Sequence, residues 1–168
     1  MNDSVLIRIA VTMGDASGIG PEVIVKALAD PEIAGLAQWI IIGEKTILTQ
    51  AARKANLPFN PFLIKDFSNL PNTSSTVLLE LEQFNAHQVV PGQLNPDCGR
   101  AALEYIRTAT HLCLTQKVAA MVTAPVNKEA IVLSGVSFSG HTEFIAALCG
   151  TQESRLMLTK QNLSVVHV

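Results

Sequence analysis

The 168-residue sequence has few charged residues, few cysteines and no long hydrophobic run, and each shortage excludes a class of protein. Charged residues make up 15% and the formal net charge is −2, so the charge balance does not favour nucleic acid or an anionic membrane as partner. Apolar runs such as 39–42 and 118–122 are far shorter than the roughly 18 residues of a membrane-spanning helix. The N-terminus carries Asp3 and no cleavage pattern, so no secretory signal is predicted.

The cysteines also limit the possibilities. Cys98, Cys113 and Cys149 are odd in number and widely spaced, which is typical of neither a disulfide framework nor a zinc knuckle. They fit a reducing cytoplasm, where we expect the protein to be located. Each is predicted to be a small, buried apolar residue.

Strand-like and helix-like segments alternate along the chain. Strands that are apolar throughout, separated by amphipathic helices, predict an α/β fold with a mostly parallel sheet covered on both faces. The predicted strands are 6–12, 38–42, 62–65, 77–81, a buried strand at 118–123, 155–159 and 163–168; the predicted helices are 21–29, 44–55, 96–113 capped by Asn95, 128–133 and 142–148. The last strand pattern stops at Val168 without a turn or cap, which predicts a truncated chain.

The segment 13–22 places three glycines between a strand and a helix, where open α/β proteins put their sites. Its spacing, G-x-x-x-G-x-G, is not the dinucleotide pattern G-x-G-x-x-G, and no Gly-Lys-Ser/Thr follows. Asp15 and Glu22 would also repel a phosphate among the loop amides. A ligand site and a tight structural turn therefore both stay open. Glu44 follows the second predicted strand, as a ribose-binding acid would, but the glycine spacing argues against that interpretation.

Two further segments carry polar groups after predicted strands and turns. In 123–128, Lys128 could neutralise a carboxylate or phosphate, or could be an ordinary solvated lysine. In 138–144, His141 and Thr142 begin a helix after Gly140, so amides, a hydroxyl and an imidazole gather at its positive end. That combination suits an anionic ligand, and the alternative is a capping arrangement with an incidental histidine.

Together these segments resemble the PdxA family, the 4-hydroxythreonine-4-phosphate dehydrogenases. The matching stretches are 9–22, 123–130 and 140–143, in the family's order and spacing; Ala16 departs from the family, since many relatives carry proline there. The resemblance covers the N-terminal half only. It implies α/β/α layers similar to isocitrate and isopropylmalate dehydrogenases, truncated, with 1–122 as the N-terminal part of a first domain and 123–168 as the start of a second, incomplete domain.

The resemblance also implies a reaction, which is the NAD-dependent and metal-dependent oxidation and decarboxylation of 4-phosphohydroxy-L-threonine in pyridoxal 5'-phosphate biosynthesis. His141 and Thr142 would bind substrate, and Asp15, Asn127 and Lys128 would lie in the cleft; no residue is assigned as catalytic. The full-length enzyme would be a cytoplasmic homodimer.

The implied cofactors are NAD or NADP and a divalent zinc, magnesium or cobalt ion. The metal ligands are expected beyond Val168, so none is assigned in this chain and His167 is not one of them. Four alternatives stay open: a D-threonate or D-erythronate 4-phosphate dehydrogenase paralogue, a related class that oxidises cyclic dihydrodiols, an inactive truncated remnant, and a nucleotide-binding module.

Overall fold

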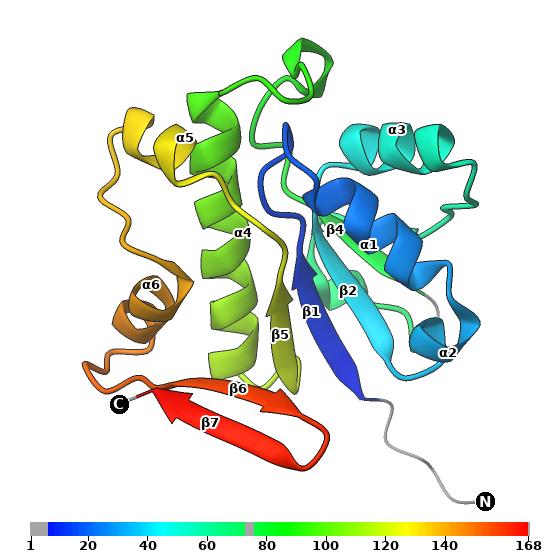
Figure 1. Cartoon of the computed structure of the whole chain (residues 1–168). Coiled ribbons are helices and arrows are strands. Elements are labelled where there is room, and N and C mark those ends of the chain that lie inside the picture. Colours follow the sequence, from blue (N-terminus) through cyan, green and yellow to red (C-terminus); the bar gives the residue numbers. More distant parts are fainter. Residues whose placement is uncertain (1–6, 73–75, 168) are drawn as a thin grey trace, which may run out of the picture.

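The computed structural model describes residues 7–72 and 76–167 and shows a parallel sheet flanked by helices, followed by a separate hairpin (Figure 1). The strands are β1 (Arg8–Thr12), β2 (Gln38–Gly43), β3 (Phe62–Ile64), β4 (Val77–Glu80), β5 (Ala120–Thr123), β6 (Leu156–Lys160) and β7 (Leu163–His167). The helices are α1 (Gly20–Leu28), α2 (Pro31–Ala34), α3 (Lys45–Ala55), α4 (Pro96–Leu114), α5 (Lys128–Leu133) and α6 (His141–Leu148), with short 3-10 turns at Phe67–Asn69 and Ala86–Gln88.

The predicted strands and helices are confirmed within one or two residues at most boundaries, although Leu6 and Val168 lie outside the described residues. Helix α2 was not predicted. Its signal is local, because Asp30 accepts a hydrogen bond from the amide of Glu32 and Pro31 occupies the first helical position. A four-residue helix is too short to show apolar periodicity, which is why the pattern missed it.

The main sheet has five strands in the order β3-β4-β2-β1-β5, and every pairing in it is parallel. The central strand β2 carries Ile40, Ile41 and Ile42, which are fully buried. Burial on both faces explains why this strand is apolar throughout instead of alternating. The prediction of a mostly parallel sheet is therefore confirmed.

Helices α4 and α1 cover opposite faces of this sheet. Met121 of β5 contacts Thr110 of α4, so α4 lies on the face to which Met121 points. The next residue, Val122, must point to the opposite face. There it lines an apolar groove of about 220 Å³ together with Val23 and Ala27 of α1. The layers are thus helix, sheet and helix.

The prediction that 118–123 is a buried strand is wrong. Strand β5 begins only at Ala120, and Val122 is 49% exposed. Within the described ranges β5 pairs only with β1, so it forms an edge of the sheet, and α1 leaves part of its outer face uncovered. Apolar composition alone does not distinguish a central strand from an edge strand.

The burial prediction for the three cysteines has a mixed outcome. Cys98 is fully buried and Cys113 is partly buried, but Cys149 is exposed, so the prediction for Cys149 is wrong.

Strands β6 and β7 pair as an antiparallel hairpin that is exposed along its whole described length. Of the described helices, none combines the length and the apolar character needed to cross a membrane.

A second, smaller apolar cluster lies on the far side of α4 from the sheet. It consists of Leu103, Ile131 and Phe138, and it packs α5 and the segment before α6 onto α4 (Figure 1). The cluster spans the predicted domain boundary at 122/123, since Leu103 lies before it and Ile131 and Phe138 lie after it. The division into two domains itself stays a prediction.

Candidate functional site

The glycine loop is packed directly against the connection between β5 and α5. Gly14 has a φ of +72°, and a side chain there would collide with the carbonyl oxygen of Pro125. The amide of Asp15 donates a hydrogen bond to that same oxygen at 3.0 Å. Glycine is therefore required at position 14 both for its backbone conformation and for the close approach. The contact brings two of the three motifs together.

Three loop amides, those of Asp15, Ser17 and Gly18, donate hydrogen bonds within the protein. The carboxylate of Asp15, which is only 3% exposed, accepts hydrogen bonds from the Ser17 amide and hydroxyl, both at 2.9 Å. The amide of Gly18 donates to the carbonyl of Asp15 at 3.0 Å. These donors are not directed toward a phosphate, so the geometry favours the structural-turn alternative for this part of the loop. The side chain of Asp15 is turned onto its own loop, and its expected place in a cleft stays a prediction.

Asn127 and Lys128 follow β5 and begin α5. The side-chain oxygen of Asn127 accepts a hydrogen bond from the amide of Ala130 at 3.1 Å, which makes Asn127 the N-cap of the helix. The ammonium of Lys128 donates to the carbonyl of Ser139 at 2.7 Å. Lys128 thereby links the start of α5 to the turn that leads into α6.

His141 and Thr142 occupy the first turn of α6. The N-cap position is Gly140, and no side chain caps the helix. Phe138 packs edge-on against the His141 ring, with the centroids 5.9 Å apart. The Nε2 atom of His141 is buried and has no hydrogen-bond partner among the described residues. An uncapped helix tip beside an unpaired imidazole nitrogen is a place where a ligand could supply the missing partners.

The protonation of His141 follows from its surroundings. Burial lowers the pKa of His141 below its ordinary value of 6.5; a hydrogen bond with the backbone of Ala124 partly offsets this, and the charge of Lys128 lowers the pKa further. The imidazole is therefore mainly neutral at pH 7. The Ala124 hydrogen bond raises the pKa and so uses a ring N–H, and Nε2 has no partner, so the proton of the neutral ring lies on Nδ1 and Nε2 is a hydrogen-bond acceptor.

The glycine loop and the segment before and at His141 thus both contact the middle motif, residues 123–128. Gly14 contacts Pro125, His141 contacts Ala124, and Lys128 reaches the residue before Gly140. The groove of about 220 Å³ beside Ala124 and Pro125 is lined mostly by apolar groups and does not include His141 or Thr142. A phosphorylated ligand fits the polar tip of α6 better than that groove.

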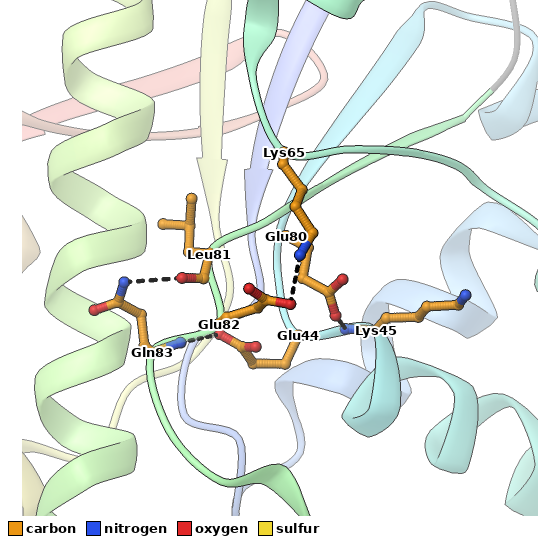
Figure 2. Close-up of polar contacts among 7 residues, drawn as sticks. All are labelled: Glu44, Lys45, Lys65, Glu80, Leu81, Glu82 and Gln83. Atoms are coloured by element: carbon orange, nitrogen blue, oxygen red, sulfur yellow. Dashed lines mark hydrogen bonds and ion pairs between the residues drawn. The ribbon is translucent and has the colours of Figure 1, made fainter.

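Glu44 is part of a buried polar network and is not directed toward a ligand. It is 3% exposed and accepts hydrogen bonds from the Tyr105 hydroxyl at 2.8 Å and the Gln83 amide at 3.0 Å. Figure 2 shows the Gln83 contact, next to Glu80, whose carboxylate accepts from the first amide of α3 at Lys45. The ribose-binding interpretation of Glu44 therefore has no support in this geometry.

Tyr105 is a structural residue that the sequence reasoning missed. Its hydroxyl lies 61 positions from Glu44 along the chain, so no local pattern connects the two. Burial, and then the charge of Glu44, raise the pKa of Tyr105 far above its ordinary value. The hydroxyl is therefore protonated at neutral pH and donates a hydrogen bond to Glu44.

The residues in 7–72 and 76–167 contain no cluster of three or more His, Cys, Asp or Glu side chains suited to a metal ion. The expectation that the metal ligands lie beyond Val168 stays a prediction. Cys98 lies close to the glycine loop, but burial raises the pKa of its thiol to about 12, and Asp15 adds to this effect. A thiol with that pKa is a poor nucleophile near pH 7.

Comparison with known proteins places this geometry in context. Residues 35–168 match the family model described as "Pyridoxal phosphate biosynthetic protein PdxA". A 4-hydroxythreonine-4-phosphate dehydrogenase of Trichlorobacter lovleyi is 38% identical over 164 residues, which cover 96% of this chain and 48% of that relative. A D-threonate 4-phosphate dehydrogenase of Cupriavidus necator is also 38% identical, covering 95% and 48%.

A solved structure agrees with the sequence comparisons. The crystal structure of a 4-hydroxythreonine-4-phosphate dehydrogenase from Burkholderia phymatum superposes with a TM-score of 0.88 at 34% identity, covering 98% of this chain and 50% of that one. The chain spans about half the length of the curated relatives it matches.

The contact between Gly14 and Pro125 leads to a first prediction. Gly14→Ala should lower the free energy of unfolding by about 2 kcal/mol or more, because it adds both a strained φ and a backbone collision. Gly92→Ala is the matched control, since Gly92 has a φ of +79° but open space around it. It should cost about 1–2 kcal/mol. Urea unfolding followed by Trp39 fluorescence measures both, and equal losses would contradict the role of the contact.

The Glu44 network leads to a second prediction. Tyr105→Phe should lower the free energy of unfolding by about 1–3 kcal/mol, because a buried carboxylate loses one of its donors. Glu80→Gln alters a carboxylate that is only partly buried and serves as control, with a loss below half of that value. The same urea titration measures the free energy of unfolding of both variants. A decrease in Tyr105→Phe no larger than that in Glu80→Gln would show that the hydroxyl contributes little to stability.

A third prediction concerns pH. Because the pKa of His141 is lower in the folded chain than its ordinary 6.5, the unfolded chain takes up a proton first as the pH falls. The free energy of unfolding of wild type relative to that of His141→Gln should be highest above pH 6.5. It should decrease as the pH falls from 6.5 toward the pKa of His141 in the folded chain. Unfolding titrations across this range test it. His111→Gln, at an exposed position, should show no comparable trend.

Proposed function

The chain belongs to the PdxA family, and from that premise we propose that it is the substrate-binding half of an NAD-dependent dehydrogenase. The proposed reaction is the oxidation and decarboxylation of 4-phosphohydroxy-L-threonine in pyridoxal 5'-phosphate biosynthesis. The observation that carries the proposal is the uncapped tip of α6, where the unpaired Nε2 of His141 lies next to Thr142. The whole protein would act as a cytoplasmic homodimer.

Each residue at this tip has a proposed role. The neutral imidazole of His141 would hydrogen-bond the substrate through Nε2, and the Thr142 hydroxyl would bind the same molecule. The first amides of α6 and its positive end would favour the acidic part of the substrate. Asn127 would hold α5 in place as its cap, and Asp15 would keep the glycine loop closed against Pro125, so that both shape the cleft without touching substrate.

The proposal assigns cofactor and metal binding to residues beyond this chain. A divalent metal, when bound, would polarise the substrate hydroxyl as a Lewis acid. Its ligands would lie beyond Val168, and the described residues contain no group of three or more candidate ligands. NAD or NADP would accept the hydride. The chain's own contribution would be to bind and orient the substrate.

A second substrate has specific support. The relative named as a D-threonate 4-phosphate dehydrogenase is as similar to this chain, at 38% identity, as the relative named for 4-hydroxythreonine 4-phosphate. The two substrates share the carboxylate and the phosphate and differ at C2, which bears an amino group in one and a hydroxyl group in the other. Only a contact at C2 would therefore distinguish them, and D-threonate or D-erythronate 4-phosphate stays the alternative.

The proposal predicts that the 168-residue chain alone forms no NADH. The assay combines the purified chain with NAD, Mg²⁺ or Zn²⁺ and each phosphorylated substrate, and clear NADH formation would contradict it. A chimera that joins this chain to the second half of the Trichlorobacter lovleyi relative should regain activity. The substrate with the higher kcat/KM identifies the function. A well-folded chimera inactive with both substrates supports the inactive remnant.

Within the active chimera, His141→Asn should raise KM by about tenfold or more, because the substrate loses a hydrogen-bond partner at a buried atom. Thr142→Ala should act in the same direction. His111→Asn is the matched control at an exposed position of α4 and should leave both constants unchanged. Unaltered KM values in both tip variants would remove His141 and Thr142 from the substrate site.

A further inference from the structure

The turn that leads into α6 lacks the usual means of holding a helix start in place. Gly140 has no side chain to accept a hydrogen bond from the first amides, and its backbone is extended. On one side the turn is held by Phe138, which is buried against Leu103 and Ile131. Ser139 is exposed, and its carbonyl faces Lys128.

Lys128 lies where helix electrostatics disfavour a cation. It is the first residue of α5, at the positive end of that helix, and Asn127 already caps the helix. Among the ion pairs of the described residues, none involves Lys128. The stabilising contact of its ammonium is the carbonyl of Ser139, 2.7 Å away. The Lys128 side chain therefore stabilises the turn before α6 and does not stabilise α5, to which it belongs.

The contact between Lys128 and Ser139 also affects the charge at the tip of α6. Glu143 lies in the first turn of α6, and its carboxylate passes close to Gly140. Glu129 lies in the first turn of α5. Two carboxylates near the helix tips would weaken the attraction for an acidic ligand. The ammonium of Lys128, held at Ser139 immediately before Gly140, supplies a positive charge that offsets this.

From these contacts we infer that Lys128 is a positioning residue for the anion-binding tip of α6. Its hydrogen bond to Ser139 holds the turn so that the amides of His141 and Thr142 face one ligand, and its charge keeps the tip attractive to a carboxylate or phosphate. The identity of the ligand rests on the proposed function. The stabilisation of the turn by Lys128 does not depend on it.

Amide hydrogen exchange of the 168-residue chain tests the hold on the turn. Lys128→Gln should speed exchange in the peptide that spans 138–142 by about fivefold, since a charge-assisted hydrogen bond is lost. Lys128→Arg should restore slow exchange, because it keeps a charged donor. Lys117→Gln, at an exposed lysine in the turn after α4, is the control and should change nothing in this peptide. Unchanged exchange in Lys128→Gln overturns the inference.

Titration with inorganic phosphate, followed by the NMR signals of the His141 and Thr142 amides, tests the positioning of the ligand. Lys128→Gln should weaken the response by about fivefold, and Lys128→Arg should keep most of it. A weakened response with unchanged exchange would make Lys128 a direct charge contact and overturn the positioning role. If the wild-type amides ignore phosphate, the anion site of the proposed function fails, while the exchange experiment still decides whether Lys128 holds the turn.

Discussion

A close approach of two backbones, Gly14 against the carbonyl of Pro125, holds the motif-bearing loops in one place. The contact involves no side chain at position 14, which is why the loop needs a glycine there. Because the connection after β5 is fixed in this way, Ala124 lies beside His141 and Lys128 reaches Ser139. The arrangement of the candidate site follows from the contact of these two loops at the carboxyl end of the sheet.

The glycine loop and the tip of α6 have different roles. The amides of the glycine loop donate to Asp15 and Pro125, so the loop acts as a support. The tip of α6 has the opposite character, with no cap and an imidazole nitrogen without a partner in the described chain. Polar groups that are satisfied internally stabilise the fold, whereas those left open are available to a ligand. The two motifs look equally suited to a ligand in the sequence, and their hydrogen bonds separate them.

Most of the secondary structure could be predicted because its causes are local. Apolar periodicity located the strands and helices, and Asn95 is confirmed as the cap of α4. Burial was predicted less well, since Val122 and Cys149 are apolar or small yet exposed. Whether such a residue is covered depends on which element packs over it. The pairing of Glu44 with Tyr105 was missed for the same reason, because the two residues meet only when α4 packs beside β2.

The sequence by itself determined the family, the alternation of strands and helices, and the three motifs, because each depends on residue types at short spacing. Tertiary structure alone decided which motif keeps open hydrogen-bonding groups, and that β5 lies at the sheet edge. It also decided that Lys128 binds the turn before α6, through the carbonyl of Ser139. The physical reason is that satisfaction of polar groups and burial of apolar groups both depend on neighbours that are distant along the chain.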